Sequence, residues 1–184
     1  GGGDSVKTAL DTAIEKDPNF AEAYVARSAY LLEGKKYDEA LEDIENAIQL
    51  SPNSAPAYNQ LAKIYWAQDE LEDALDAAAK SIELDRTILE SYLLLGQLYE
   101  ANGEIEKAGE IVATYILYDD ENADAFAILG GAYYEDGKYE DAIEVLDKAI
   151  KLSSRSGIAH YYRGLSYLEL EDGENAVNDL EKAN

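Results

Sequence analysis

A period of 34 residues runs through this sequence without a gap, and it constrains the fold more than any other feature. The aligned segments begin at Ala21, Ala55, Leu89, Ala123 and Gly157. One column of the alignment holds alanine five times, at Ala40, Ala74, Ala108, Ala142 and Ala176. Invariant alanine is expected where two helices approach too closely for a larger side chain. The period therefore indicates an array of similar structural repeats.

Further columns describe the inside of each repeat. One contains only small residues: Ser28, Ala62, Gly96, Gly130 and Gly164. Two are mainly aromatic: Tyr24, Tyr58, Tyr92, Phe126 and His160 form the first, and Leu31, Tyr65, Tyr99, Tyr133 and Tyr167 the second. Large residues opposite small ones would interlock neighbouring helices. Apolar spacings of three and four predict two amphipathic helices per repeat, joined by turns at 33–35, 102–104 and 136–138 in which we expect glycine to take the left-handed helix end.

This order of residues resembles the tetratricopeptide repeat family, whose helix-turn-helix unit carries an aromatic residue, a Leu-Gly pair, a Tyr, an Ala and a closing Pro. The segment 129–143 follows that pattern closely. The resemblance implies an all-α fold, a right-handed α-solenoid of tandem helix-turn-helix repeats. The implied repeats are 21–54, 55–88, 89–122 with a divergent second helix, 123–156, and 157–184 without its last turn. Residues 4–20 fit a second helix alone, and the glycine run 1–3 is typical of a cloning remnant.

Several positions depart from the family pattern. Arg27 and Arg163 stand where the pattern has leucine, and Tyr115 fills a column that is otherwise small. Gly109 lies inside the predicted helix 105–117, where glycine is unfavourable. We therefore expect looser or altered packing around that helix.

Both ends of the array are expected to be open. The last helix carries Val177 and Leu180 with no polar capping helix after it, and the first half-repeat lacks its hairpin partner. Excision from a longer protein is the simplest explanation. The alternative is a structural segment that stacks on other copies through its uncapped ends.

The charge of the chain restricts its partners. It has 15 Lys plus Arg against 39 Asp plus Glu, a formal net charge of -24. Such a chain repels phosphate backbones and anionic lipid, so we expect no nucleic acid partner. No apolar run approaches about 18 residues, so no direct membrane insertion is expected. The acidity has two interpretations, a solvated surface or attraction of a basic partner. The absence of Cys leaves the compartment undetermined.

No residues form a recognisable catalytic or metal constellation. His160 is the only histidine, and its place in an aromatic column indicates packing. Asp120, Asn122 and Asp124 imitate the start of a calcium loop, but Ala125 replaces the required glycine and Gly131 the required Glu. Helix caps are the expected role for these residues. We predict no enzyme activity, no cofactor and no metal site.

The resemblance also implies where a partner would bind. First helices of this family line an inner groove, and the repeat register assigns sixteen candidate partner-binding residues to it: Val25, Asn59, Gln60, Lys63, Trp66, Glu90, Leu93, Leu94, Gln97, Glu100, Asp124, Ile128, Tyr134, Tyr161, Tyr162 and Leu165. This lining is apolar with an acidic fringe. It favours a protein or peptide that is amphipathic and basic. The alternative is that several of these side chains only pack against neighbouring repeats.

One known binding mode of the family does not fit. Some tetratricopeptide domains hold the C-terminal carboxylate of heat-shock chaperones with Lys and Asn in one repeat, Asn in the next, and Lys and Arg in the third. If the comparison starts at the first full repeat, Val25, Gln60 and Glu90 stand among those positions. If it starts one repeat later, Asn59 and Lys63 match the first repeat of the pattern, but Leu94, Asp124 and Ile128 follow in the next two. A third register supplies no basic residue. Chaperone-tail recognition is therefore not expected.

Overall fold

The computed structural model describes residues 2–183, and within them the chain is entirely helical apart from its turns. Its eleven helices are α1 (Gly2–Lys16), α2 (Ala21–Glu33), α3 (Tyr37–Leu50), α4 (Ala55–Ala67), α5 (Leu71–Leu84), α6 (Leu89–Ala101), α7 (Ile105–Ile116), α8 (Ala123–Glu135), α9 (Tyr139–Leu152), α10 (Gly157–Glu169) and α11 (Gly173–Lys182). Gly1, part of the glycine run, and Asn184, in the last repeat, lie outside the described residues. Gly2 and Gly3 belong to α1. None of the described helices has the length and apolarity needed to cross a membrane.

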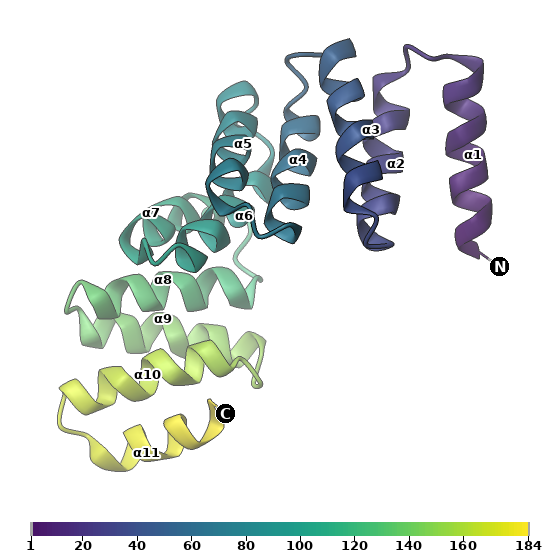
Figure 1. Cartoon of the computed structure of the whole chain (residues 1–184). Helices are drawn as coiled ribbons and strands as arrows, with labels where there is room; N and C mark the ends of the chain where they lie inside the picture. Colours follow the sequence, from purple (N-terminus) through teal and green to yellow (C-terminus); the bar gives the residue numbers. More distant parts are fainter. Residues whose placement is uncertain (1, 184) are drawn as a thin grey trace. The chain divides into compact units, whose positions relative to one another are not determined.

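The chain divides into two compact units, 1–91 and 92–184, and the division falls inside α6. Within each unit, successive helices run side by side as hairpins (Figure 1). We call α2, α4, α6, α8 and α10 the first helices, and α1, α3, α5, α7, α9 and α11 the second helices. In the hairpins, α2 packs on α3, α4 on α5, α8 on α9 and α10 on α11, and α2, α4, α8 and α10 each also pack on the second helix before them. The all-α fold predicted from the repeat is confirmed.

Small residues allow the two helices of a hairpin to approach closely. All five members of the alanine column are fully buried. A methyl group on Gly130 would lie 2.4 Å from Cγ of Leu146, and one on Gly96 would lie 2.4 Å from a methyl carbon of Val112. Contacts between real side-chain carbons are never so short, so these columns are small for steric reasons.

Each hairpin turn contains one residue in the left-handed conformation, and these residues form a column. They are Lys35, Asp69, Gly103, Gly137 and Glu171, with φ between 57° and 77°. The following N–H donates back to the carbonyl five residues earlier in every hairpin, for example Lys36 to Leu31 at 2.9 Å. The expectation that glycine takes this position holds at Gly103 and Gly137. It is wrong in the first turn, where Gly34 has φ −77° and Lys35 is the left-handed residue.

Side-chain caps begin several first helices. The Oδ1 atom of Asn122 accepts hydrogen bonds from the backbone N–H groups of Asp124 and Ala125, at 3.0 and 3.1 Å. Ser54 and Ser156 cap α4 and α10 in the same way. Asn122 therefore acts as a helix cap, the role expected for this calcium-like segment.

The divergent helix α7 packs closely on α8 at Gly109. A methyl group there would lie 2.3 Å from Cβ of Ala132, so glycine is the residue that permits the contact. Of the looser or altered packing expected around this helix, the packing at Gly109 is altered and not looser, because the interior glycine brings the helices closer together. Tyr115 is buried, and its hydroxyl donates to the carboxylate of Asp119.

The two arginines that replace leucine form equivalent ion-pair networks. The Nε and Nη2 atoms of Arg27 each lie 2.7 Å from a carboxylate oxygen of the buried Asp43, and Nη1 lies 2.8 Å from Asp11. Four repeats later, Arg163 forms the same bonds with Asp179 and Asp147. These arginines replace apolar packing with a bidentate pair between the two helices of a hairpin.

His160 joins the second network. Its Nδ1 atom lies 2.8 Å from the buried Asp179, and its Nε2 atom lies 3.2 Å from the Ser154 carbonyl oxygen. Burial acts to raise the pKa of Asp179, but the hydrogen bonds from Arg163 and His160 prevail and hold that pKa below its usual range. His160 is buried at a packing position, as its column indicates, and it also has a polar partner that the column did not reveal.

Candidate functional site

All sixteen candidate binding residues lie on first helices, and their side chains differ in exposure. In the first unit, Trp66 and Glu90 are exposed, whereas Val25 and Lys63 are partly buried. Lys63 is already paired within the unit, since its Nζ atom lies 2.6 Å from a Glu90 carboxylate oxygen. In the second unit, Asp124 and Tyr161 are exposed. The partly buried members there are Leu93, Gln97, Glu100, Tyr134, Tyr162 and Leu165.

Four of the sixteen predicted binding residues are buried: Asn59, Gln60, Leu94 and Ile128. Asn59 packs in the first unit, where its Nδ2 atom donates to the Ser91 hydroxyl at 2.8 Å. At most 6% of each of these four residues is exposed, so they offer almost no surface to a partner. This corrects the prediction for these four, because the repeat register gives the direction of a side chain but not what its neighbours cover.

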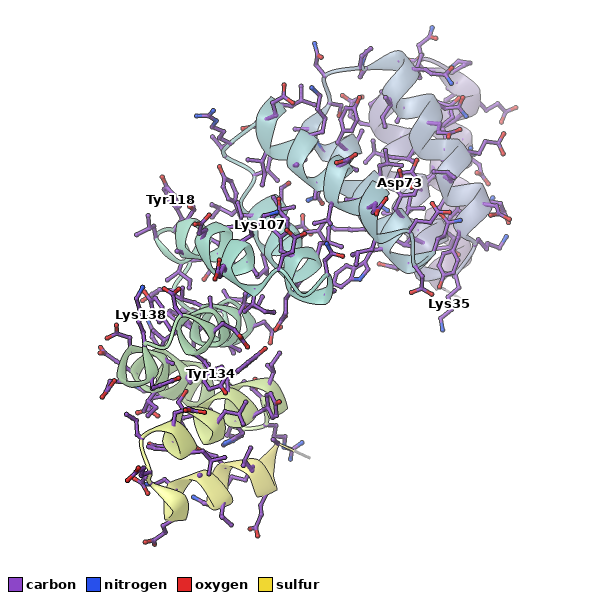
Figure 2. The ribbon with its side chains drawn as sticks, turned by 60° about the vertical axis from the view of Figure 1, so that its left-hand side comes forward. Lys35, Asp73, Lys107, Tyr118, Tyr134 and Lys138 are labelled. Atoms are coloured by element: carbon purple, nitrogen blue, oxygen red, sulfur yellow. The ribbon has the colours of Figure 1, made fainter. Side chains whose placement is uncertain are left out.

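Tyrosine side chains gather on the second unit, and we call Tyr134, Tyr139, Tyr161 and Tyr162 the tyrosine cluster. The Tyr134 ring centroid lies 5.9 Å from that of Tyr162 on α10 and 5.7 Å from that of Tyr139 on α9. Tyr161 and Tyr162 meet edge to face at 5.3 Å. These are favourable aromatic separations, so the rings support one another. Figure 2 labels Tyr134 at the end of α8 that leads into the turn with Lys138.

The position of the cluster follows from local sequence and packing. The ring of Tyr162 lies over Gly131, where an added methyl group would come within 2.9 Å of a ring carbon. Glycine at that position of α8 thus lets α10 bring its tyrosine close. Tyr161 keeps 47% of its surface exposed beside it, so the cluster combines a packed base with an accessible ring.

Carboxylates surround the tyrosine cluster. Burial raises the pKa of Tyr134, and the nearby Glu169 and Glu135 add to this effect. Burial likewise raises the pKa of Tyr162, together with Glu100 and Glu135. The pKa of Glu100 is itself raised, first by burial and then by Asp124. The cluster therefore lies in a negative local potential that favours a positively charged group.

Two sets of residues escaped the sequence prediction. Tyr139 belongs to a second helix, so a search restricted to first helices missed its part in the cluster. The arginine networks were also missed, although the sequence contains their signal. In the column that contains Arg27 and Arg163, the other three repeats have leucine, at Leu61, Leu95 and Leu129. In the column that contains Asp43 and Asp179, the same three repeats have the apolar residues Ala77, Ile111 and Val145. Aspartate therefore appears in the second column only in the repeats that have arginine in the first.

The described residues contain no group of three or more His, Cys, Asp and Glu side chains placed to hold a metal ion. The candidate site is therefore the tyrosine cluster with the carboxylates around it.

Comparisons with known proteins identify the repeat. Models described as tetratricopeptide repeat match residues 9–42, 31–89 and 89–122, and one described as TPR repeat matches 130–171. A search of curated proteins found no match.

Solved structures similar to the chain include YrrB, a TPR protein with an unusual peptide-binding site, at 20% identity and a TM-score of 0.83, covering 95% of this chain and 90% of YrrB. MamA is 26% identical, with a TM-score of 0.74 and coverage of 85% and 91%. MamA from Desulfovibrio magneticus RS-1 is 20% identical, with a TM-score of 0.78 and coverage of 89% and 92%. The sequence period, the hairpins and these matches agree, and the chain belongs to the tetratricopeptide repeat family.

Proposed function

We propose that this chain is a non-catalytic scaffold that binds a peptide or protein segment through the tyrosine cluster of its second unit. The segment carries apolar residues beside at least one Lys or Arg. The observation behind this proposal is the combination of an accessible tyrosine, Tyr161, with the carboxylates of Glu100, Glu135 and Glu169 around the cluster.

The chemistry of the cluster supports a cationic anchor. A guanidinium or ammonium group over a tyrosine face gains roughly 0.5–2 kcal/mol, more when water is excluded. Nearby carboxylates add charge attraction and speed the encounter of oppositely charged molecules. The tyrosine rings also supply apolar contact area at little entropic cost, so apolar residues beside the cation would add to the affinity.

The similar proteins support the general class of this function. YrrB is described as having a peptide-binding site, and its fold covers nearly the whole of this chain. Repeat arrays commonly present extended surfaces for partners. The choice of a basic and apolar segment rests on the residues of this chain alone.

A peptide pair tests the proposal. We expect a fluorescent 12-residue peptide of alternating Arg and Leu to bind, and its citrulline analogue, which has the same shape without charge, to bind about tenfold more weakly. Added salt should weaken only the Arg peptide, because screening acts on charge. Equal binding of the two peptides would refute the cationic anchor. If neither peptide bound, peptide recognition by this surface would be wrong.

Self-association is a second candidate function, favoured by one observation. Val177 on α11 is 57% exposed, whereas Leu41, Leu75 and Ile143 in the same column are partly buried. A second copy of the chain could cover this face. Light scattering at several concentrations distinguishes the candidates, since a mass that stays monomeric would exclude self-association.

A further inference from the structure

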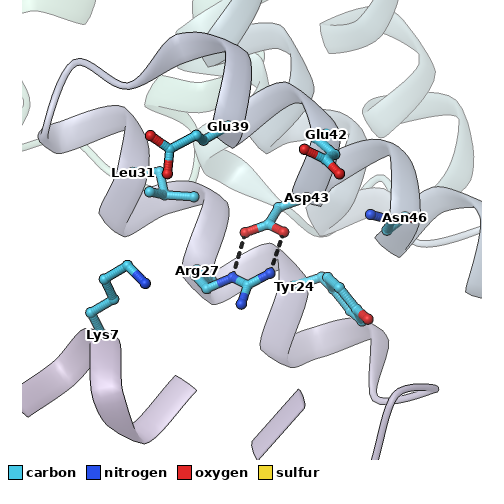
Figure 3. A pocket seen from close by; sticks show the side chains of 8 residues that line it. All are labelled: Lys7, Tyr24, Arg27, Leu31, Glu39, Glu42, Asp43 and Asn46. Carbon is cyan, nitrogen blue, oxygen red and sulfur yellow. Dashed lines mark hydrogen bonds and ion pairs between the residues drawn. The ribbon is translucent and has the colours of Figure 1, made fainter. Parts of the chain in front are cut away.

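The first unit contains a pocket of about 390 Å³ that the tyrosine cluster does not explain. It lies between α1, α2 and α3 (Figure 3). Its lining consists of Lys7, Tyr24, Arg27, Leu31, Glu39, Glu42, Asp43 and Asn46. This volume falls within the range of pockets that hold small ligands or single side chains.

Arg27 lies at the centre of this pocket with its guanidinium held in a fixed plane. All three of its nitrogens donate to carboxylates, two to Asp43 and one to Asp11. Tyr24 lies beside it, with 5.7 Å between the guanidinium carbon and the ring centroid. Three of the five N–H groups of Arg27 are engaged in the plane, so its flat face is a well-placed surface for a ligand, and aromatic rings stack on such a face readily.

The equivalent place four repeats later carries a tyrosine beside its arginine. Arg163 is paired with Asp179 and Asp147 as Arg27 is with Asp43 and Asp11, and Tyr167 follows Arg163 by four residues on the same helix. Burial raises the pKa of Tyr167, while the neighbouring Arg163 charge acts in the opposite direction, so the phenol lies within the field of the guanidinium. Leu31 holds this position beside Arg27.

The column containing Leu31 has tyrosine in every other repeat, at Tyr65, Tyr99, Tyr133 and Tyr167. Leucine at this position lacks the phenol ring, and Leu31 lines the pocket. A second replacement adds to the difference, since Lys7 stands in a column that otherwise holds Leu41, Leu75, Gly109, Ile143 and Val177. The first repeat therefore lacks the ring that all its equivalents carry, and it has a lysine where all but the Gly109 position have an apolar side chain.

We propose that this pocket receives the aromatic side chain of a partner polypeptide, with tyrosine preferred. The ring would lie beside the position at which the other repeats carry their own tyrosine and would stack on the face of Arg27. On the lining, Asn46 offers polar groups to a phenol hydroxyl, as does Lys7, whose Nζ atom also lies 2.7 Å from a carboxylate oxygen of Asp11. The ring arrives on a polypeptide in the four equivalent repeats, which is why we assign a protein partner. The site lies in the first unit and is independent of the tyrosine cluster.

Amide chemical shifts in ¹H–¹⁵N spectra of the full chain, titrated with N-acetyl-tyrosinamide, test this proposal. We expect saturable shifts at Tyr24, Leu31 and Asp43 with a Kd of about 1 mM, typical of a ligand of this size. The Leu31→Tyr variant should fill the pocket with its own ring, bind at least about tenfold more weakly and unfold at a higher temperature. Leu31→Met, which adds no ring, is the matched control and should bind as the original chain does.

Several results would overturn the proposal. One is the absence of chemical shift changes at the pocket up to about 10 mM N-acetyl-tyrosinamide. Another is that N-acetyl-leucinamide causes equal shift changes. A third is that the Leu31→Tyr variant binds N-acetyl-tyrosinamide as tightly as the original chain. Binding of 4-methylphenol without binding of N-acetyl-tyrosinamide would indicate a small-molecule site and also contradict it. Leu31→Phe provides the same comparison with a ring that lacks the hydroxyl, if Leu31→Tyr does not fold.

Discussion

Single residues explain where this chain departs from its own repeat pattern. Arg163 and Asp179 bridge the last hairpin, where the preceding hairpin uses Leu129 and Val145. Asp179 is only 1% exposed, so its partners must compensate for the hydration that its carboxylate loses on folding. A buried pair of this kind specifies one arrangement of two helices, although apolar residues could stabilise the contact as well.

Replacing one member of this pair should destabilise the hairpin strongly. Arg163→Leu leaves Asp179 with His160 as its remaining side-chain partner and should lower the free energy of unfolding by about 3 kcal/mol. The triple variant H160F, R163L and D179V copies Phe126, Leu129 and Val145 from the preceding repeat. It should unfold within about 1 kcal/mol of the original chain or be more stable. Urea titrations measure both, and a triple variant as unstable as Arg163→Leu would contradict this account.

The same pair predicts a dependence on pH. The pKa of Asp179 is lower in the folded chain than in the unfolded chain, so its contribution is present above about pH 4 and is lost as the pH falls through the folded value. The stability difference between the original chain and the triple variant should therefore shift in favour of the variant below about pH 4.

At the level of the element, the sequence predicts the helices well, but it misplaces one left-handed turn residue by one position. The helix pairs could be predicted because the apolar spacing and the alanine column repeat five times. The left-handed turn residue could not be read from glycine alone, since Gly34 precedes the turn position and Lys35 occupies it. The spacing of the turn within the repeat fixes that position, whatever residue is present.

The turns therefore offer a prediction at the level of the element. Lys35→Gly should raise the free energy of unfolding by about 1 kcal/mol, because a side chain in the left-handed region is strained and glycine is not. Gly137→Ala is the reciprocal variant and should lower it by a similar amount. Gly173→Ala, where an added methyl group meets no atom within 4 Å, serves as a control. A loss of stability on Lys35→Gly would show that the turn is held differently.

At the level of the whole molecule, the fold was easier to predict than the site. A repeat contacts mainly its neighbours, so the regular spacing was sufficient for the all-α hairpins. The candidate site depends on which side chains neighbours cover, and burial removed Asn59, Gln60, Leu94 and Ile128 from the accessible set. Packing also added Tyr139 from a second helix to the tyrosine cluster. Both effects arise from contacts between helices, which a register carried along the sequence does not contain.

The most direct test of the proposed function compares two tyrosines of the second unit. Tyr161 belongs to the tyrosine cluster, whereas Tyr118 lies in the turn after α7 and is 73% exposed (Figure 2). Isothermal titration of the Arg-Leu peptide should show about tenfold weaker binding to Tyr161→Ala, the loss of one aromatic anchor, and unchanged binding to Tyr118→Ala. Unchanged affinity in Tyr161→Ala, or an equal loss in both variants, would contradict binding at the tyrosine cluster.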